Sequence, residues 1–243
     1  MEKIRFGSLW VGGPLTKVQE VSLASFVYYG HDITLYVYDA DLKVPAGVKK
    51  ADAREILAED RLFKVKDSYA SFSDMFRYNM IQKTGLAWVD ADTICLSPNW
   101  NFEDNIFASW EIGMDPCVVG GVLSLPKDSE IVKYLVSSVD SIDITTAGWA
   151  TMGPHLLHTA FKKYDYMKYA YHYKVFLGIQ IHEWITLWTP QGFDFVMGLY
   201  DTTKCISLYN AMATAAGIDK NSLPSGSAME FFYNRFVVHN EHV

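Results

Sequence analysis

The chain has 243 residues, a formal net charge of −7 and three cysteines, and half of its residues are hydrophobic. This composition allows a large core and excludes wholesale disorder, and the acidic balance argues against a general binder of nucleic acids. The N-terminal segment lacks the charged and apolar regions of a signal peptide, and no apolar run approaches the ~20 residues that cross a bilayer. We therefore expect a soluble, cytoplasmic protein with reduced cysteines.

The first strand and the first helix are marked by boundary residues. The segment 4–13 predicts a strand that runs into a Gly-Gly-Pro turn. Thr16 and Gln19 have the spacing of a capping box, which predicts the start of a helix. Gly30 is typical of the residue that follows the end of such a helix.

Two more strands alternate with helices up to residue 96. The pattern predicts a strand over 32–41, helical stretches that begin near Asp52 and Ser68, and a buried strand over 86–96. This β-α-β-α-β order predicts a mostly parallel sheet with helices on its faces. Ligands of such sheets bind at the C-terminal ends of the strands, where this chain places polar residues.

The second half of the chain is less regular. Strands are predicted over 106–111 and 117–125, and helices over 129–139, 153–163 and 227–236. The segment from about Thr202 to the last helix reads as a loop rich in Gly, Ser and Pro. No internal repeat and no long linker is visible, so we expect a single domain.

Asp90 and Asp92 interrupt the apolar run 86–96. Strand residues two apart face the same way, so the two carboxylates can converge on one point. Such a pair needs a shared proton or a cation, and hard oxygen ligands suit Mg²⁺ or Mn²⁺ when a substrate diphosphate completes the shell. The spacing alone leaves an alternative open, namely a turn in which the aspartates cap backbone N–H groups.

The helix before this strand carries a second polar group. Asp74, Arg77 and Tyr78 have helical spacing and share one face. A local ion pair of little energetic value is one interpretation. The other is that an arginine and a carboxylate, aimed at the same end of the sheet as the aspartate pair, bind a phosphate and a sugar hydroxyl.

Residues 73–98, SDMFRYNMIQKTGLAWVDADTICLSP, resemble the core motif of metal-dependent glycosyltransferases with the GT-A fold. The pattern of that family is Ser-Asp-x-x-Arg-Tyr, an apolar helix, Gly, an aromatic residue and Asp-x-Asp. The chain is similar to the family of fungal initiating mannosyltransferases and α-1,4-glycosyltransferases, and to the catalytic domains of glucosylating bacterial toxins. The resemblance covers residues 4–98 and reappears over 206–227.

The resemblance implies an α/β fold of GT-A type, Rossmann-like, with a mostly parallel central sheet flanked by helices. The whole chain, 1–243, would form one domain. Residues 1–98 would be its nucleotide-sugar-binding half, and 99–243 would supply the acceptor half and a C-terminal closing segment.

The resemblance also implies a donor site. Its expected residues are Trp10, Val11, Gly12, Asp74, Arg77, Trp88, Asp90, Ser207 and Tyr209. Within it Trp10 would stack on the base, most often uracil in related proteins, and Asp74 would hold sugar hydroxyls. Arg77 would bind the sugar or the diphosphate.

The metal ligands and catalytic residues follow from the same resemblance. Asp92 would ligate Mn²⁺ or Mg²⁺ directly, with Asp90 and Ser207 as further ligands, and Asp90, Asp92 and Arg77 would be catalytic. Many relatives have His in place of Ser207 and Trp in place of Tyr209. The toxins have an acidic residue where this chain has Lys204, which is able to neutralise diphosphate but not to bind a cation.

The implied activity is metal-dependent transfer of a hexose from a nucleotide sugar, with UDP favoured, to a hydroxyl acceptor with retention of configuration. A glycan is the favoured acceptor. One alternative is a phage-type glycosyltransferase that acts on hydroxymethylated DNA bases. An alternative of another class is a non-catalytic module that binds nucleotide sugars or carbohydrates.

Residues 161–174, FKKYDYMKYAYHYK, interleave four lysines with five tyrosines in an otherwise acidic protein. A packed amphipathic segment with solvated lysines is one interpretation. The other is an acceptor platform, because tyrosines stack on sugars and on exposed bases. The candidate acceptor residues are His155, Lys162, Tyr164 and Tyr171.

Overall fold

The computed structural model describes residues 4–111, 116–148 and 150–238. The strands are β1 (Arg5–Trp10), β2 (Asp32–Val37), β3 (Lys49–Asp52), β4 (Ala87–Val89), β5 (Thr93–Cys95), β6 (Phe107–Glu111), β7 (Cys117–Ser124), β8 (Ala170–His172) and β9 (Cys205–Ser207). The α-helices are α1 (Lys17–Tyr28), α2 (Ala70–Thr84), α3 (Glu130–Ser141), α4 (Leu156–Lys163), α5 (Tyr173–Phe176), α6 (Phe193–Met197), α7 (Asn210–Ala215) and α8 (Ala228–Tyr233).

Shorter helical turns connect these elements. The 3₁₀ turns are Ala53–Glu55, Glu59–Arg61, Glu103–Asn105, Met167–Tyr169, Ile181–Trp188 and Pro190–Gly192, and the π-helical turns are Thr151–His155 and Asn234–Val238. None of the helices over the described ranges is long and apolar enough to cross a membrane.

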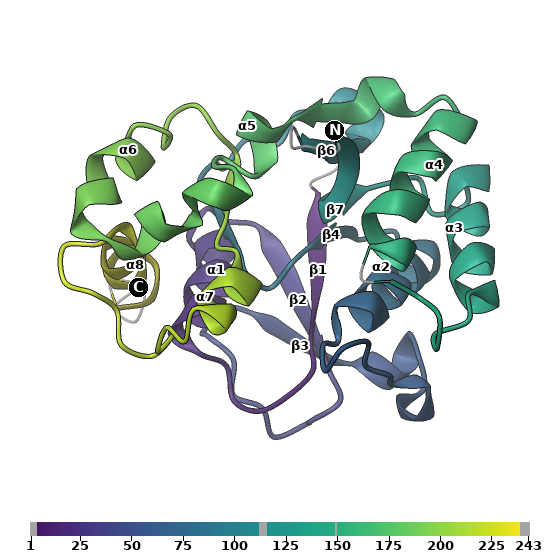
Figure 1. Ribbon diagram of the computed structural model, residues 1–243, viewed down its shortest axis with the longest axis horizontal. Coiled ribbons are helices and arrows are strands. Elements are labelled where there is room, and N and C mark those ends of the chain that lie inside the picture. The colour runs from purple at the N-terminus through teal and green to yellow at the C-terminus, as the bar shows by residue number, and fades with distance from the viewer. Residues whose placement is uncertain (1–3, 112–115, 149, 239–243) are drawn as a thin grey trace.

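The described residues form a seven-stranded sheet in the order β3-β2-β1-β4-β7-β6-β8 and a two-stranded sheet of β5 and β9. β1 runs parallel to β2 and β4, β2 is parallel to β3, and β7 is antiparallel to both of its neighbours. Helices α2, α3 and α4 cover one side of the large sheet, while α1, α7 and α8 lie on the other (Figure 1). The prediction of one mostly parallel α/β sheet flanked by helices is confirmed.

The boundaries of the first two long helices follow their local signals. The backbone N–H of Thr16 donates to Oε1 of Gln19 at 3.2 Å, as the capping box predicts. Gly30 and Gly85 follow the ends of α1 and α2 with φ of +75° and +71°, a left-handed conformation that glycine adopts without steric cost.

The strand predicted over 86–96 is wrong as a single element. β4 ends at Val89, and the N–H of Thr93 donates to the carbonyl of Asp90 at 3.1 Å, which closes a turn. The chain then leaves the large sheet and continues as β5, which pairs with β9. Asp90 and Asp92 therefore lie in a turn between two sheets, and the face rule for strands does not orient them.

Three other strands were not predicted, one of which is β8, within the segment 161–174. β3 ends at Asp52, and the helix expected to begin there is wrong, because the chain forms two short 3₁₀ turns instead. β9 lies in the segment read as a loop, where it covers β5 and brings Cys205 opposite the equally buried Cys95. Both thiols are free, in agreement with the expectation.

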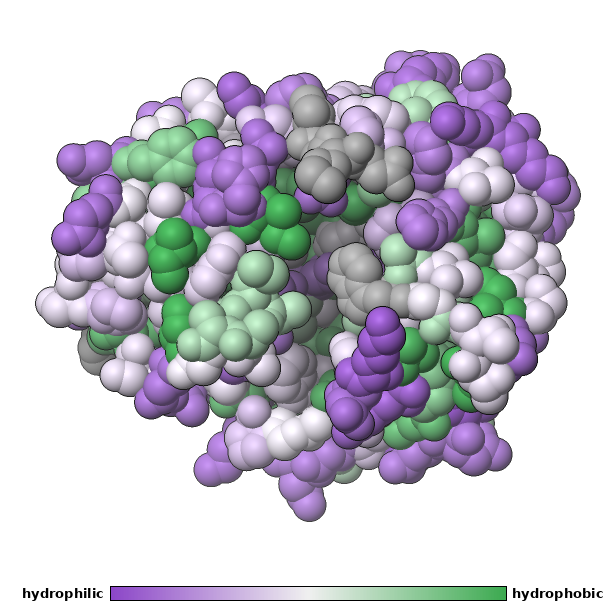
Figure 2. Space-filling model, in the orientation of Figure 1, coloured by the Kyte–Doolittle hydropathy of each residue, from purple (hydrophilic) through white to green (hydrophobic). Residues whose placement is uncertain are grey.

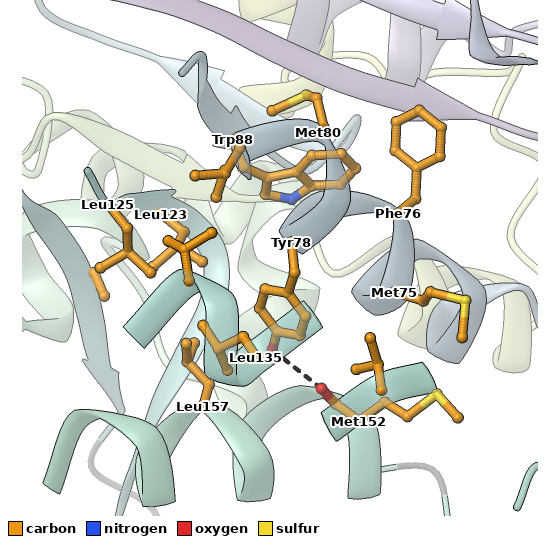
Figure 3. Packing of buried hydrophobic residues seen from close by; sticks show 14 of the residues in the cluster. Met75, Phe76, Tyr78, Met80, Trp88, Leu123, Leu125, Leu135, Met152 and Leu157 are labelled. Atoms are coloured by element: carbon orange, nitrogen blue, oxygen red, sulfur yellow. Dashed lines mark hydrogen bonds between the residues drawn. The ribbon is translucent and has the colours of Figure 1, made fainter. Parts of the chain in front are cut away.

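The core beside α2 fixes this helix against the sheet and against α3 (Figure 3). Tyr78 is fully buried, and its hydroxyl donates to the carbonyl of Met152 at 3.0 Å. Phe76 and Leu135 belong to the same cluster, together with the indole of Trp88. Tyr78 is therefore a core residue, and it holds α2 so that Asp74 and Arg77 lie next to the end of β4.

Candidate active site

The Asp90 carboxylate is oriented by two donors. Its Oδ1 accepts hydrogen bonds from Nη2 of Arg77 at 2.9 Å and from Nε1 of Trp88 at 2.7 Å. Its backbone N–H still donates to Gly121 of β7, so the residue is anchored to the large sheet. Oδ2 accepts no hydrogen bond from another described residue, and it is the oxygen left for a ligand.

Arg77 lies between two carboxylates and is almost completely buried. Its Nη1 is 3.0 Å from Oδ1 of Asp74, and its guanidinium lies 5.1 Å from the centre of the Trp88 ring. Burial raises the pKa of Asp74 to about 7, although the charge of Arg77 lowers it. Nε of Arg77 is buried without a hydrogen-bond partner in the described part of the chain. The structure thus brings Asp74, Arg77, Trp88 and Asp90 together as expected.

Three glycines leave room for this cluster. A Cβ atom at Gly120 of β7 would clash with Nη1 of Arg77, and one at Gly153 would lie 2.6 Å from Oδ2 of Asp74. A Cβ at Gly121 would be 3.2 Å from Oδ2 of Asp90. Sequence reasoning did not assign these residues to the site, although adjacent glycines inside a strand are a signal of close approach by another group.

The C-terminal segment is fastened to Asp92. The N–H of Asn210 donates to Oδ2 of Asp92 at 2.9 Å, and the N–H of Leu208 donates to its carbonyl at 2.8 Å. Ser207 pairs with Thr93, directly after Asp92. Burial and the neighbouring charge of Asp90 raise the pKa of Asp92 to about 6, and Oδ1 of Asp92 accepts no hydrogen bond from another described residue.

Two residues at this end of the site were missed. Asn210 acts on Asp92 through its backbone, and its Oδ1 accepts a hydrogen bond from Nζ of Lys220 at 2.9 Å. The charge of Lys220 lowers the pKa of Asp92. Lys204 is not the cation beside Asp92. It lies before β9, at the opposite end of that strand from Ser207, and its Nζ is 3.2 Å from Oγ of Ser97.

Tyr209 is held in an unusual conformation directly before α7. Its φ of 47° is left-handed, and its hydroxyl donates to the carbonyl of Ile179 at 2.8 Å. Burial raises the pKa of this phenol, and the charges of Glu111 and Asp92 raise it further. The side chain therefore lies near the aspartate pair, although its hydroxyl is engaged by the protein.

A pocket of about 210 Å³ lies at the C-terminal ends of β1 and β2. It is lined by Trp10, Val11, Gly12, Val37, Tyr38, Asp39, Leu42, Glu59 and Leu62. Nε1 of Trp10 donates to the carbonyl of Gly13 at 2.8 Å, which fixes the half-buried indole at the pocket. The three donor residues expected at the end of the first strand thus line one cavity.

The four candidate acceptor residues lie on the π-helical turn Thr151–His155, on α4 and directly after it, and on β8. His155 and Lys162 are exposed, on the π-helical turn and on α4. Tyr164 packs on Tyr134 of α3 with ring centres 5.6 Å apart, and Tyr171 packs on the buried ring of Phe176. No hydrogen bond joins these side chains to Asp90 or Asp92 within the described ranges.

The protein oxygens fit a divalent cation only in part. No group of three His, Cys, Asp or Glu side chains in the described residues is placed to hold a metal ion. Asp90 and Asp92 each have one oxygen without a hydrogen bond from another described residue, and Ser207 pairs with Thr93, directly after Asp92. Hard oxygen donors of this kind suit Mg²⁺ or Mn²⁺ when substrate oxygens complete the coordination shell.

Comparison with solved structures relates this arrangement to known folds. The chain is similar to a structure named "PaToxG Glycosyltransferase", with a TM-score of 0.51 and 15% sequence identity, over 96% of this chain and 84% of that one. No protein-family model and no curated protein matches the sequence. At this identity the similarity shows a common fold, and it confirms the α/β class of GT-A type.

Proposed function

We propose that the protein is a metal-dependent glycosyltransferase that moves a hexose from a UDP-sugar to a hydroxyl acceptor, with retention of configuration. The main support is the position of the Arg77–Asp90 pair. It lies at the end of β4, directly beside β1, whose own end carries the Trp10 pocket. A nucleotide at one strand end and a diphosphate-sugar at the next is the arrangement that parallel α/β sheets use for such ligands. The fold shared with a glycosyltransferase agrees with this proposal.

The donor would extend from the pocket to the aspartate pair. Trp10 would stack on the uracil while Val11 and Gly12 line the base site. Asp74 and Arg77 would bind the sugar hydroxyls and the diphosphate, because a guanidinium presents paired donors to phosphate oxygens. Both side chains are already ordered by their ion pair, so little conformational entropy would be lost on binding.

Mn²⁺ or Mg²⁺ would be held by Asp92, Asp90 and Ser207, and when bound it would neutralise charge on the diphosphate. Arg77 and Lys220 are the cations that the chain itself places near these groups. As the bond between the anomeric carbon and the phosphate breaks, negative charge develops on the leaving diphosphate, and these cations stabilise it. We assign no covalent nucleophile, and attack by the acceptor on the face of the leaving group gives retention.

The test is a panel of UDP- and GDP-sugars with and without Mn²⁺, read by melting temperature and by released nucleotide. We expect Mn²⁺-dependent release of UDP from at least one sugar, and its loss in the double variant Asp90→Asn, Asp92→Asn, which keeps the shape of both side chains. Donor binding without release would indicate a non-catalytic binding module. Equal turnover by the double variant would exclude this site.

A further inference from the structure

A second group of polar side chains lies next to Tyr209, outside the donor residues. β6 runs parallel to β8, with Trp110 opposite His172. Glu111 is the last residue of β6, and Tyr173, the first residue of α5, directly follows β8. Neither residue is among the expected donor residues, and both lie in the half of the chain that is expected to supply the acceptor site.

Hydrogen bonds join Tyr173 to the segment that supports Tyr209. Nε2 of Gln180 donates to the hydroxyl of Tyr173 at 3.2 Å. The hydroxyl of Tyr209 donates to the carbonyl of Ile179, the residue before Gln180, at 2.8 Å. Leu208, the residue before Tyr209, donates its N–H to the carbonyl of Asp92 at 2.8 Å. The group therefore adjoins the aspartate pair.

Glu111 is the carboxylate in this group that no other described residue engages. It is half-buried, and no hydrogen bond or ion pair links it to another residue of the described chain. Glu183, by contrast, accepts the N–H of Gln180 at 2.8 Å as part of a helix cap. A partly desolvated carboxylate without a partner costs stability, and a ligand that supplies a hydrogen-bond donor removes that cost.

The surroundings of Glu111 match a sugar better than a charged ligand. Tyr173, Gln180 and Tyr209 combine ring faces with amide and hydroxyl groups, and carry no positive charge at neutral pH. Ile181 and Ile185, both on the 3₁₀ turn Ile181–Trp188 that follows Gln180, are 44% and 43% exposed. Figure 2 shows the molecule hollowed beside α7, with hydrophilic residues at the bottom of the hollow and apolar residues along part of its edge.

We propose that Glu111, Tyr173, Gln180 and Tyr209 form the acceptor site, that the acceptor is a sugar hydroxyl, and that Glu111 is its base. This inference rests on the proposed function. The hydroxyl oxygen forms a bond to the anomeric carbon while the bond from that carbon to the phosphate oxygen breaks, with its electron pair on the diphosphate. The hydroxyl proton passes to Glu111.

The experiment compares Glu111→Gln with Glu183→Gln, the same change at the neighbouring, internally bonded carboxylate. With the UDP-sugar that the donor panel identifies, we would measure transfer to a set of methyl glycosides and hydrolysis to free sugar. Glu111→Gln should lower transfer by about 100-fold, in the range found for general bases, and leave the Kd of UDP unchanged. Glu183→Gln should preserve both the rate of transfer and the Kd of UDP. Tyr173→Phe should raise the KM of the acceptor.

The outcomes separate this inference from the proposed function. No turnover of any UDP- or GDP-sugar by the unaltered protein overturns both. Donor turnover with an unchanged ratio of transfer to hydrolysis in Glu111→Gln overturns the acceptor site alone. Transfer to hydroxymethylated DNA and to none of the glycosides overturns the assignment of a sugar acceptor.

Discussion

Arg77 is placed where a hydrophobic residue would make a more stable core. Its guanidinium is nearly inaccessible and is shared by Asp74 and Asp90, and its Nε is left unpaired. Buried ionic groups of this kind seldom stabilise a protein compared with well-packed apolar side chains. Their cost is consistent with a role in ligand binding, which is the basis for the donor site proposed above.

Trp10 gives the first prediction at the scale of single residues. If its indole stacks on the base, Trp10→Ala should weaken UDP and UDP-sugars alike, by about 1–3 kcal/mol. Binding of Mn²⁺ should change little, because Asp90 and Asp92 are untouched. Calorimetry with UDP measures this directly, and equal affinities in the two proteins would remove Trp10 from the site. A preference for GDP would instead contradict the assignment of uracil.

Gly120 and Gly7 give a matched pair of substitutions in central strands. A Cβ at Gly120 meets the guanidinium of Arg77, which two carboxylates hold in place, whereas a Cβ at Gly7 meets the flexible side chain of Met80. Both Gly→Ala variants should lose stability, Gly120→Ala by roughly 1–3 kcal/mol because its neighbour cannot move freely.

The two variants should differ in binding. Gly120→Ala should lose affinity for UDP-sugars by displacing Arg77, and Gly7→Ala should retain it. Chemical denaturation and donor titration measure the two effects separately. Retained donor affinity in Gly120→Ala would show that the position of Arg77 is not required.

At the scale of elements, local signals were sufficient for α1 and α2 and insufficient for the small strands. Capping residues and terminal glycines mark a helix within its own sequence. The break between β4 and β5 has no such mark, because the residues on both sides are apolar and the partner of β5 is β9, far along the chain. β3 is short and polar at the edge of the sheet, so it shows no alternation of apolar residues.

Variants in the segment 161–174 distinguish a packed segment from an acceptor platform. Tyr164 packs on Tyr134 between α4 and α3, and Lys163 lies 4.0 Å from the centre of the Tyr134 ring. We therefore expect Tyr164→Ala to lower the free energy of unfolding by about 0.5–1.5 kcal/mol or more. Lys162→Gln, at an exposed position, is the control and should leave stability unchanged. A raised acceptor KM in Tyr164→Ala at unaltered stability would support an acceptor platform instead.

For the molecule as a whole, the sequence indicated which side chains belong to the candidate site, and it did not indicate where backbone groups contribute to it. The resemblance placed Trp10, Arg77 and Asp90 at one edge of the sheet, and the structure brings them there. Asn210 and Gly120 were missed because one acts through its N–H group and the other through the lack of a side chain. A backbone N–H group and a missing side chain cannot be recognised from residue types that are typical of binding or catalysis.

The pH dependence of stability is a property of the whole protein that reports on Asp92. Its carboxyl has a pKa raised from 3.8 to about 6, so the folded protein keeps a proton that the unfolded chain releases. The metal-free protein should therefore lose stability as the pH rises from about 4 through about 6. In Asp92→Asn the part of this loss that comes from Asp92 is absent, while the part from Asp74 remains, so its melting temperature relative to the unaltered protein should rise over that range.

The melting temperature should change by on the order of 2–4 °C for each kcal/mol of stability gained or lost. Asp128→Asn, at an exposed position, should give a curve parallel to that of the unaltered protein. Parallel curves for Asp92→Asn as well would contradict the raised pKa. Mn²⁺ should stabilise the unaltered protein more at pH 7.5 than at pH 5.5, because its ligands must be deprotonated.

The pairing of β9 with β5 also sets an order of assembly during translation. Asn210 donates to Asp92 across 118 positions of the chain, so the base pocket and the aspartate pair leave the ribosome long before the segment that completes them. Until then the edge of β5 is open and able to pair with other strands. A premature stop codon before Cys205 would thus yield a product that lacks a finished donor site and carries an aggregation-prone edge.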